Sequence, residues 1–409
     1  MKALVLCGGL PQIALIKELK SRGIFTILAD MNEKVPAREY ADKFYPVSVL
    51  DVDAVRKVAI EEKVDYILTV CADQVLQVVA QIAEELGLPW YIDYQTAENV
   101  SKKSYMKEIF CENGIPTTKF VIMNQFDEKK IKHLKYPIIV KPVDSYSSRG
   151  VCKVNSLDEL RSAFENAVNI SRTHGAIVEE FAEGEEITVD VYVEDGKAHV
   201  LCLSKLDKIP DNDRFVIYRS HIPAPVTEAV RAMICDVAQK ITDAFELQNC
   251  PMLIQLISDG KRISVVEFCA RTGGGIKFLM IKKFSGFDVV KAVVDLTLGE
   301  KPHVDEIKKP EKFTVNEFVY CSNGEFDHIE GFEELLSENI IVEYSAFKAS
   351  GFKFDGIKSS GDRVAYFSVE ADTLEELKKR HGIANMRIKA LDRNGIDLIR
   401  HDLISQYQK

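Results

Sequence analysis

Lys141 and the loop that follows it carry residue types that bind phosphate. Lys141 ends an apolar stretch, and residues 144–150 (DSYSSRG) come next. A small, hydroxyl-rich loop between two strands exposes backbone N–H groups that can fold over a polyphosphate. A lysine at a strand end is also commonly solvated, and a serine-rich loop is often only a loop. The pair therefore indicates a phosphate site only together with other residues.

Five carboxylates lie between two apolar stretches, in residues 179–186 (EEFAEGEE). Runs of charge usually form solvated faces. Clustered carboxylates repel one another, however, and they gain from nearby cations or hydroxyl groups. This segment is therefore a candidate partner for a polar ligand.

A third polar group surrounds the hairpin near residue 260. Gln255 and Glu267 flank the hairpin, and Arg271 is followed by Gly273–Gly275. An acid, a cation and three glycines after a buried strand suggest that the backbone approaches a ligand closely. A turn at residues 260–261 would set Gln255 opposite Val266, next to Glu267, whereas a turn at residues 259–260 would displace it by three residues. The residues alone fit both turns.

The common nucleotide and hydrolase motifs are missing. There is no G-x-x-x-x-G-K-[ST], and Gly8-Gly9 after a strand is only half of G-x-G-x-x-G. Asp30 stands about where a dinucleotide-binding acid would be, but a turn residue that ends a strand is the simpler interpretation. H-E-x-x-H, G-x-S-x-G and protein-kinase signatures are also absent. If the protein handles phosphate, another arrangement must do it.

The elements that must position these residues change character along the chain. The first hundred residues alternate strands and helices, which predicts a parallel, doubly wound sheet. Beyond residue 101, short strands, a helix and two hairpins follow, and the last third is antiparallel α+β in character. The predicted strands and helices are 3–6, 11–22, 25–29, 52–62, 66–70, 75–86, 103–113, 137–141, 151–154, 176–181, 186–193, 198–203, 227–245, 252–257, 263–268, 313–320, 340–344, 363–369 and 373–381.

Composition limits the classes of function. The 409 residues include 53 Lys+Arg and 63 Asp+Glu, a formal charge of −10, which argues against an extended nucleic-acid or anionic-membrane surface. With 46% apolar residues there is material for two or three packed domains. No run of 18 apolar residues and no signal-peptide pattern occurs. Nine scattered cysteines without a C-x-x-C pair are typical of a reducing compartment, so a cytoplasmic location is expected.

Taken in order, these residues resemble the ATP-grasp superfamily of carboxylate–amine ligases, most strongly over residues 101–305. Among its members, the chain looks most similar to the amino-acid ligases and to carbamoyl-phosphate-synthetase-like proteins. The resemblance implies a mixed α/β and α+β chain with an ATP-grasp fold. It implies a Rossmann-like pre-ATP-grasp domain at 1–100, an ATP-grasp domain at 101–310 with a mobile lid at about 116–182, and a C-terminal antiparallel α+β lobe at 311–409.

The resemblance also implies roles for individual residues. ATP and Mg²⁺, with Mn²⁺ as a possible substitute, are the expected cofactors, and Gln255 and Glu267 are the expected metal ligands. The family usually has Asn at the position of Cys269, and a thiol is a poor magnesium ligand. Arg271 would face an acyl phosphate, and His221 would either contact the substrate or serve as a structural turn residue. The residues implied to bind ATP are Lys103, Lys141, Ser145, Ser147, Ser148, Gly150, Glu179, Glu180, Ala182 and Glu186.

The function implied is an ATP-dependent ligase that activates a carboxylate, expected to be an amino acid, as an acyl phosphate and joins it to an amine. Three alternatives stay open: a bicarbonate-activating enzyme of the same fold, a catalytically silent ATP-binding module, and a dinucleotide-dependent oxidoreductase built on the N-terminal sheet. The missing G-x-G-x-x-G counts against the last. The expected partners are small molecules, with neither nucleic acid nor membrane. Homodimers are common in the family, and the sequence leaves the oligomeric state open.

Overall fold

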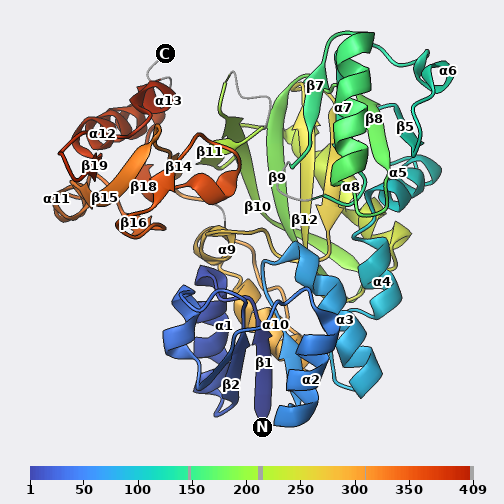
Figure 1. Ribbon diagram of the computed structural model, residues 1–409, viewed down its shortest axis with the longest axis horizontal. Coiled ribbons are helices and arrows are strands. Elements are labelled where there is room, and N and C mark those ends of the chain that lie inside the picture. Colours follow the sequence, from blue (N-terminus) through green and yellow to red (C-terminus); the bar gives the residue numbers. More distant parts are fainter. Residues whose placement is uncertain (146–148, 211–214, 309, 406–409) are drawn as a thin grey trace.

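The first part of the chain forms a parallel sheet, as its strand–helix alternation predicts. The computed structural model describes residues 1–145, 149–210, 215–308 and 310–405. The sheet has the order β3-β2-β1-β4, and its central strands are apolar and buried (Figure 1). Its elements are β1 (Lys2–Leu6), α1 (Leu10–Ser21), β2 (Phe25–Ala29), β3 (Lys43–Tyr45), α2 (Val52–Glu62), β4 (Tyr66–Leu68) and α3 (Asp73–Leu86).

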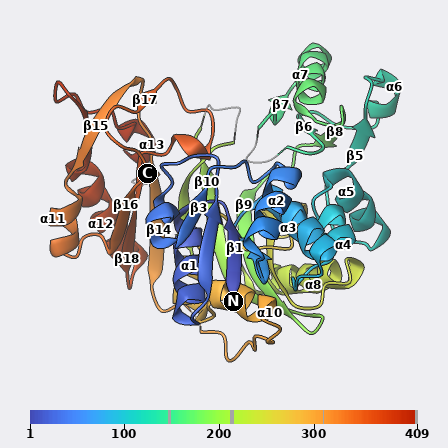
Figure 2. The same cartoon turned by 60° about the horizontal axis from the view of Figure 1, so that its bottom comes forward.

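A small antiparallel sheet with its own core follows. Its order is β5-β8-β6-β7, and α7 packs on one face through Leu160, Phe164 and Ala167. Figures 1 and 2 show this unit projecting away from the N-terminal sheet. Its elements, with the helices that precede it, are α4 (Tyr94–Asn99), α5 (Lys103–Glu112), β5 (Phe120–Met123), α6 (Glu128–Ile131), β6 (Ile138–Pro142), β7 (Cys152–Val154), α7 (Leu157–Ile170) and β8 (Ala176–Glu180).

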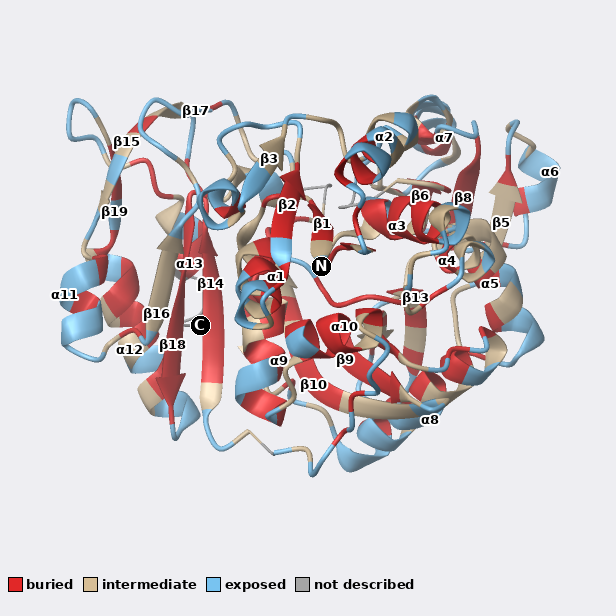
Figure 3. Cartoon of the chain, turned by 90° about the horizontal axis from the view of Figure 1, so that it is seen from below, coloured by how far each residue is buried: buried red, intermediate tan, exposed pale blue. Residues whose placement is uncertain are grey.

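A large antiparallel sheet forms the centre of the molecule. Its order is β13-β12-β9-β10-β11-β14-β18-β16, so strands from the last hundred residues extend the same sheet. In Figure 3 these strands are mostly buried, while the outer turns of the covering helices are exposed. The central elements are β9 (Glu185–Glu194), β10 (Lys197–Lys208), β11 (Ile217–Ile222), α8 (Glu228–Ala244), β12 (Cys250–Ser258), β13 (Ile263–Cys269), α9 (Lys277–Ser285) and α10 (Val289–Thr297).

The C-terminal residues are antiparallel α+β, as expected, with a core centred on Phe326, Leu335 and Phe367. The predicted strand at 340–344 is replaced by β16, which begins at Glu343. The division into domains at residues 100 and 310 stays a prediction. The C-terminal elements are β14 (Phe313–Val319), β15 (Gly324–Glu330), α11 (Phe332–Ser337), β16 (Glu343–Ala346), β17 (Lys353–Phe354), β18 (Ala365–Ala371), α12 (Leu374–Arg387), β19 (Lys389–Asp392) and α13 (His401–Ser405).

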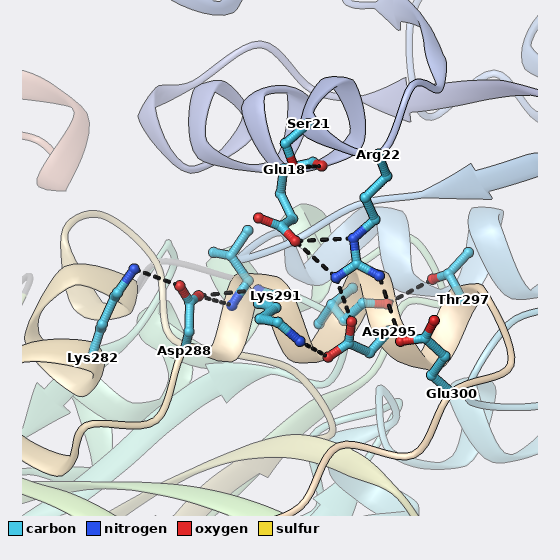
Figure 4. Close-up of polar contacts among 11 residues, drawn as sticks. Glu18, Ser21, Arg22, Lys282, Asp288, Lys291, Asp295, Thr297 and Glu300 are labelled. Carbon is cyan, nitrogen blue, oxygen red and sulfur yellow. Dashed lines mark hydrogen bonds and ion pairs between the residues drawn. The ribbon is translucent and has the colours of Figure 1, made fainter.

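Helix α10 joins the N-terminal sheet to the central sheet. Leu15 and Ile16 of α1 share one buried cluster with Val293 of α10. At the edge of this contact, Arg22 donates to Glu18 at 2.8 Å and is also hydrogen-bonded to Asp295, which Lys291 contacts at 2.7 Å (Figure 4). Apolar packing and a charged cluster therefore hold the two sheets together at this helix pair. Among the described helices, none has both the length and the apolar composition needed to cross a membrane.

Candidate nucleotide-binding site

A cleft lies between the small sheet and the central sheet. Its empty volume, including the part open to solvent, is about 980 Å³, which suits a ligand of nucleotide size. The cleft collects predicted site residues that are as much as 164 positions apart in the chain. The predicted residues that line it are Lys103, Lys141, Ser145, Glu179, Glu180, Ala182, Glu186, Gln255 and Glu267.

Glu179 and two lysines form a buried charge cluster on the wall of the cleft. Lys141 Nζ lies 2.6 Å from one carboxylate oxygen of Glu179, and Lys107 Nζ lies 2.6 Å from the other. The Thr118 hydroxyl donates to the same carboxylate at 2.7 Å. Burial alone would raise the pKa of Glu179, but the two ammonium groups lower the pKa well below its usual range. Glu179 is therefore an anion held by both lysines, of which Lys141 lines the cleft.

Lys107 is a site residue that the sequence interpretation missed. It is 1% exposed. Burial lowers its pKa to about 8, the charge of Lys141 acts in the same direction, and Glu179 opposes the shift. The available signal was its position four residues after Lys103 in α5, because residues four apart share one face of a helix.

Gln255 and Glu267 face the cleft from the β12–β13 hairpin. Strand pairing from the turn sets Leu256 against Val265, which is the register of the two-residue turn at 260–261. Val266 is then bulged, so Gln255 pairs with Glu267 instead of with Val266. Directly paired residues point to the same side of a sheet. The bulge thus brings both oxygen donors to one face.

The donor set suits Mg²⁺ bound mainly through phosphate. Lys103 forms an ion pair with Glu267. Burial acts to raise the pKa of Glu267, but the pKa is lowered, and Lys103 contributes most to the lowering. Mg²⁺ commonly takes one or two carboxylates and completes its shell with phosphate oxygens and water. In the described residues no cluster of three His, Cys, Asp or Glu side chains could hold a metal by itself. Cys269 is a neutral thiol, because burial raises its pKa, and it adds no suitable ligand.

Side chains of the remaining predicted nucleotide contacts are bonded to other residues of the protein. Glu186 forms an ion pair with Lys208, which lines the cleft but was not among the predicted nucleotide contacts. The Glu180 carboxylate accepts from the backbone N–H of Lys135 at 3.1 Å, and the N–H of Glu180 donates to the carbonyl of Lys119 at 2.9 Å. A ligand contact through the Glu180 backbone stays a prediction. The peptide of Ala182 follows at the rim of the cleft.

The loop after Lys141 is partly described. The Ser145 hydroxyl donates to the carbonyl of Arg149 at 2.5 Å. Gly150 has φ +77°, and a Cβ there would lie 2.9 Å from Pro142, so only glycine fits. Ser147 and Ser148, two predicted phosphate contacts, lie outside the described residues.

Arg271, Cys269 and His221 do not line the cleft. Arg271 donates from Nε to Asp73 at 2.5 Å and from another nitrogen to the carbonyl of Thr272 at 2.6 Å. Asp73 starts α3 in the N-terminal region, so Arg271 bridges two parts of the chain. His221 lies within β11 rather than in a turn, with Nε2 2.6 Å from Asp207. The catalytic roles expected of Arg271 and His221 stay predictions.

Comparison with known proteins decides the class of this cleft. A family model described as "ATP-grasp domain" matches residues 134–279. This chain contains an ATP-grasp domain. The match includes Lys141, the carboxylate segment at 179–186, and the hairpin with Gln255 and Glu267. The family resemblance inferred from these residues is thereby confirmed.

Curated relatives share this ATP-grasp domain at modest identity. A D-alanine–D-alanine ligase of Azobacteroides pseudotrichonymphae is 29% identical over 205 residues, 48% of this chain and 60% of that protein. A formate-dependent phosphoribosylglycinamide formyltransferase of Ignicoccus hospitalis is 26% identical over 253 residues, 59% of this chain and 62% of that protein. The aligned part spans less than two thirds of these relatives.

Solved structures confirm the ATP-grasp fold over nearly the whole chain. The L-amino acid ligase from Bacillus licheniformis superposes with a TM-score of 0.78 at 20% identity, covering 95% of this chain and 97% of that one. The biotin carboxylase domain dimer of the Hydrogenobacter thermophilus 2-oxoglutarate carboxylase, in complex with MgADP, ADP and bicarbonate, gives 0.80 at 17% identity, covering 100% and 94%. The expected architecture, with its parallel N-terminal sheet and antiparallel C-terminal lobe, is the one observed.

Proposed function

We propose that this protein is an ATP-dependent ligase that joins a carboxylate to an amine. The observation that carries the proposal is one cleft that brings Lys103, Lys141 and Glu179 to the same space as the paired Gln255 and Glu267. The lysine ammonium groups can pair with the phosphates of ATP, and the oxygens of Gln255 and Glu267 are suitable ligands for its Mg²⁺. A lysine about 4 Å from a phosphate charge contributes roughly 4 kcal/mol at a surface-like dielectric, before desolvation.

The proposed reaction has two steps with ATP as a substrate. The substrate carboxylate attacks the γ-phosphorus, ADP leaves, and an acyl phosphate forms. The amine then attacks the acyl carbon, loses a proton, and inorganic phosphate leaves. Mg²⁺, when bound at Gln255 and Glu267, would neutralise phosphate charge. Lys103 and Lys141 stabilise the charge of the transferring group, and the small sheet over the cleft excludes water.

We propose that Glu179 and Glu186 recognise the base and the ribose, with the backbone of Glu180 and Ala182 beside them. Ser145, Ser147, Ser148 and Gly150 would cover the phosphates. The proposed carboxylate-side group is Arg271, whose position is fixed by its contact with Asp73. The first substrate is proposed to be an amino acid, because the L-amino acid ligase is among the similar structures over nearly the full chain.

We also propose that the protein works in a reducing compartment such as the cytoplasm, since scattered cysteines without paired spacing are typical there. A homodimer is proposed by analogy with the biotin carboxylase domain dimer. Sedimentation equilibrium of the purified protein tests this assembly, and a single monomeric species would contradict it.

Release of phosphate from ATP tests the function. The purified protein is incubated with Mg·ATP and with amino acids singly and in pairs, and separately with bicarbonate. Stimulation by an amino-acid pair supports the ligase, with the dipeptide identified by mass spectrometry. Stimulation by bicarbonate alone supports the alternative of a carboxyphosphate-forming enzyme, and ATP binding without turnover supports a silent module. Lys141→Met should abolish turnover while leaving the circular dichroism spectrum unchanged.

A further inference from the structure

A second cavity adjoins the nucleotide cleft at the end where Gln255 lies. The two cavities share Gln255 and Ile217 as walls. The second cavity is lined by residues of α9 and of the paired strands β11 and β14, which lie side by side in Figure 1. A ligand in it would therefore meet the nucleotide site at Gln255, which is assigned to the metal.

One wall of this cavity is apolar. Leu206, Leu253, Met280 and Phe318 contribute to it, and the glycines at 273–275 leave the backbone exposed on another side. These side chains can bury an aliphatic or aromatic group by the hydrophobic effect. Ser220 and Asn316 also line the cavity, but they are already bonded within the protein, with the Asn316 amide donating to the Ser220 hydroxyl at 3.1 Å.

Arg363 places a charge in this apolar surrounding. Its guanidinium lies 3.7 Å from the centre of the Phe318 ring, Nε donates to the Tyr320 hydroxyl at 3.1 Å, and a terminal nitrogen donates to the carbonyl of Ile217 at 3.2 Å. These two bonds use two of the five N–H donors of a guanidinium. The side chain is thus held in place with donors left for a ligand.

The charge of Arg363 has no carboxylate partner within 4.0 Å in the part of the chain that the structure describes. The adjacent Asp362 instead accepts from the backbone N–H groups of Lys358 and Ser359, each at 2.8 Å. The other cation at this cavity, Lys277, already lies 3.2 Å from Asp190. Of the two cations that line this cavity, Arg363 is therefore the one without a partner of opposite charge among the described residues.

We propose that the second cavity binds an amino acid with an apolar side chain, and that Arg363 binds its carboxylate. A planar guanidinium contacts a carboxylate through two parallel hydrogen bonds. This inference rests on the proposed ligase function in one respect. A carboxylate held by Arg363 is not the one that attacks ATP, so this amino acid is the amine substrate, and its amino group is the part that reacts.

Calorimetric titration of the wild-type protein with defined probes tests the proposal. The probes are L-leucine, L-methionine and L-phenylalanine, each compared with its amide, in the presence of Mg²⁺ and the non-hydrolysable analogue AMP-PNP. At least one acid should bind, and its amide should bind about 10- to 100-fold more weakly, because the charge-assisted bonds are lost. Arg363→Gln should bind acid and amide alike, whereas Arg363→Lys should keep part of the preference.

Several controls make the result specific. AMP-PNP affinity should be unchanged in Arg363→Gln, and Arg393→Gln, which changes an arginine whose side chain is 68% exposed, should leave every affinity unchanged. If Arg363→Gln misfolds, the comparison of acid with amide in the wild type and in Arg363→Lys decides.

Three results would overturn the proposal: none of the three amino acids binds to the wild type, acid and amide bind equally, or Arg363→Gln keeps the preference. The proposed function fails separately. If amino acids bind through Arg363 but no pair stimulates phosphate release, the ligase assignment is wrong and the carboxylate site stands.

Discussion

Gln255 lies directly opposite Glu267 in the β12–β13 hairpin, and both side chains face the nucleotide cleft. The bulge at Val266 produces this relationship. The outer edge of β13 is occupied there, since the N–H of Val265 donates to Pro116 at 2.7 Å and its carbonyl accepts from Thr117 at 2.8 Å. A segment 148 residues earlier in the chain thus borders the bulge that pairs the proposed metal ligands.

Glu267→Gln should lower kcat for ATP turnover by about 10²–10³-fold, because the charge at the metal and the partner of Lys103 are both removed. Phosphate release under saturating Mg·ATP measures the change. Glu61→Gln, on the exposed face of α2, is the matched control and should behave as wild type. A near-normal rate in Glu267→Gln would remove this residue from the site.

Lys107 should give ATP affinity a pH dependence near pH 8. Below its pKa of about 8 the ammonium group shares the charge of Glu179, which allows Lys141 to turn toward phosphate. Above it the amine is neutral, Glu179 holds Lys141 more strongly, and KM for ATP should rise. The groups facing Lys107 that carry or can carry charge are Glu179, Lys141 and Cys111.

The measurement for Lys107 is the pH profile of kcat/KM for ATP from pH 6.5 to 9.5. Lys107→Met should show weak ATP binding without the inflection near pH 8. An unchanged inflection in Lys107→Met would assign the titration to another group. The same group should raise folding stability as the pH rises. Because Lys107 loses its proton at a lower pH in the native state than in the unfolded state, its contribution to the free energy of unfolding should increase between about pH 8 and 10.4.

Asp73→Asn should lower kcat about tenfold with little change in KM for ATP, a magnitude typical of residues that orient a functional side chain. Asp73 receives a hydrogen bond from Arg271, and although burial opposes ionisation, the charge of Arg271 lowers the pKa of Asp73. Steady-state kinetics with each substrate varied separates the two parameters. Equal effects on kcat and on ATP affinity would show that the contact supports the nucleotide site instead.

Arg22→Leu should lower the free energy of unfolding by about 1.5–3 kcal/mol, the range for hydrogen bonds to charged groups. Arg22 bonds Glu18 and Asp295 at the contact of α1 with α10 (Figure 4), and the Asp295 side chain is 7% exposed. Urea unfolding measures the loss, and activity of the native protein should be unchanged. Arg38→Leu, which removes an exposed ion pair with Glu33, should cost less than about 1 kcal/mol.

Local structure was well predicted where local rules decide it. The helix at 52–62 and the strand at 25–29 have the predicted limits. The turn at 260–261 was one of two that fit the residues, and the observed pairing selects it. The predicted position of Gln255 opposite Val266 was wrong by one residue. A bulge depends on what lies along the strand edge, and the residues of the hairpin do not contain that information.

The chemical character of the site was determined by the sequence itself. Lys141, the acids at 179–186, Gln255 and Glu267 are types that bind phosphate, polar ligands and metal, and their order along the chain indicated the family. Tertiary structure alone decided which charges meet. Lys107 reads as an ordinary helix lysine until α5 packs against β8 and buries it on Glu179. Arg363 becomes a candidate carboxylate ligand only because the fold surrounds it with Phe318, Tyr320 and Ile217 and pairs it with no described carboxylate. The free energy of a charged group depends on its partner and on its burial, and here both come from residues that are distant in the sequence.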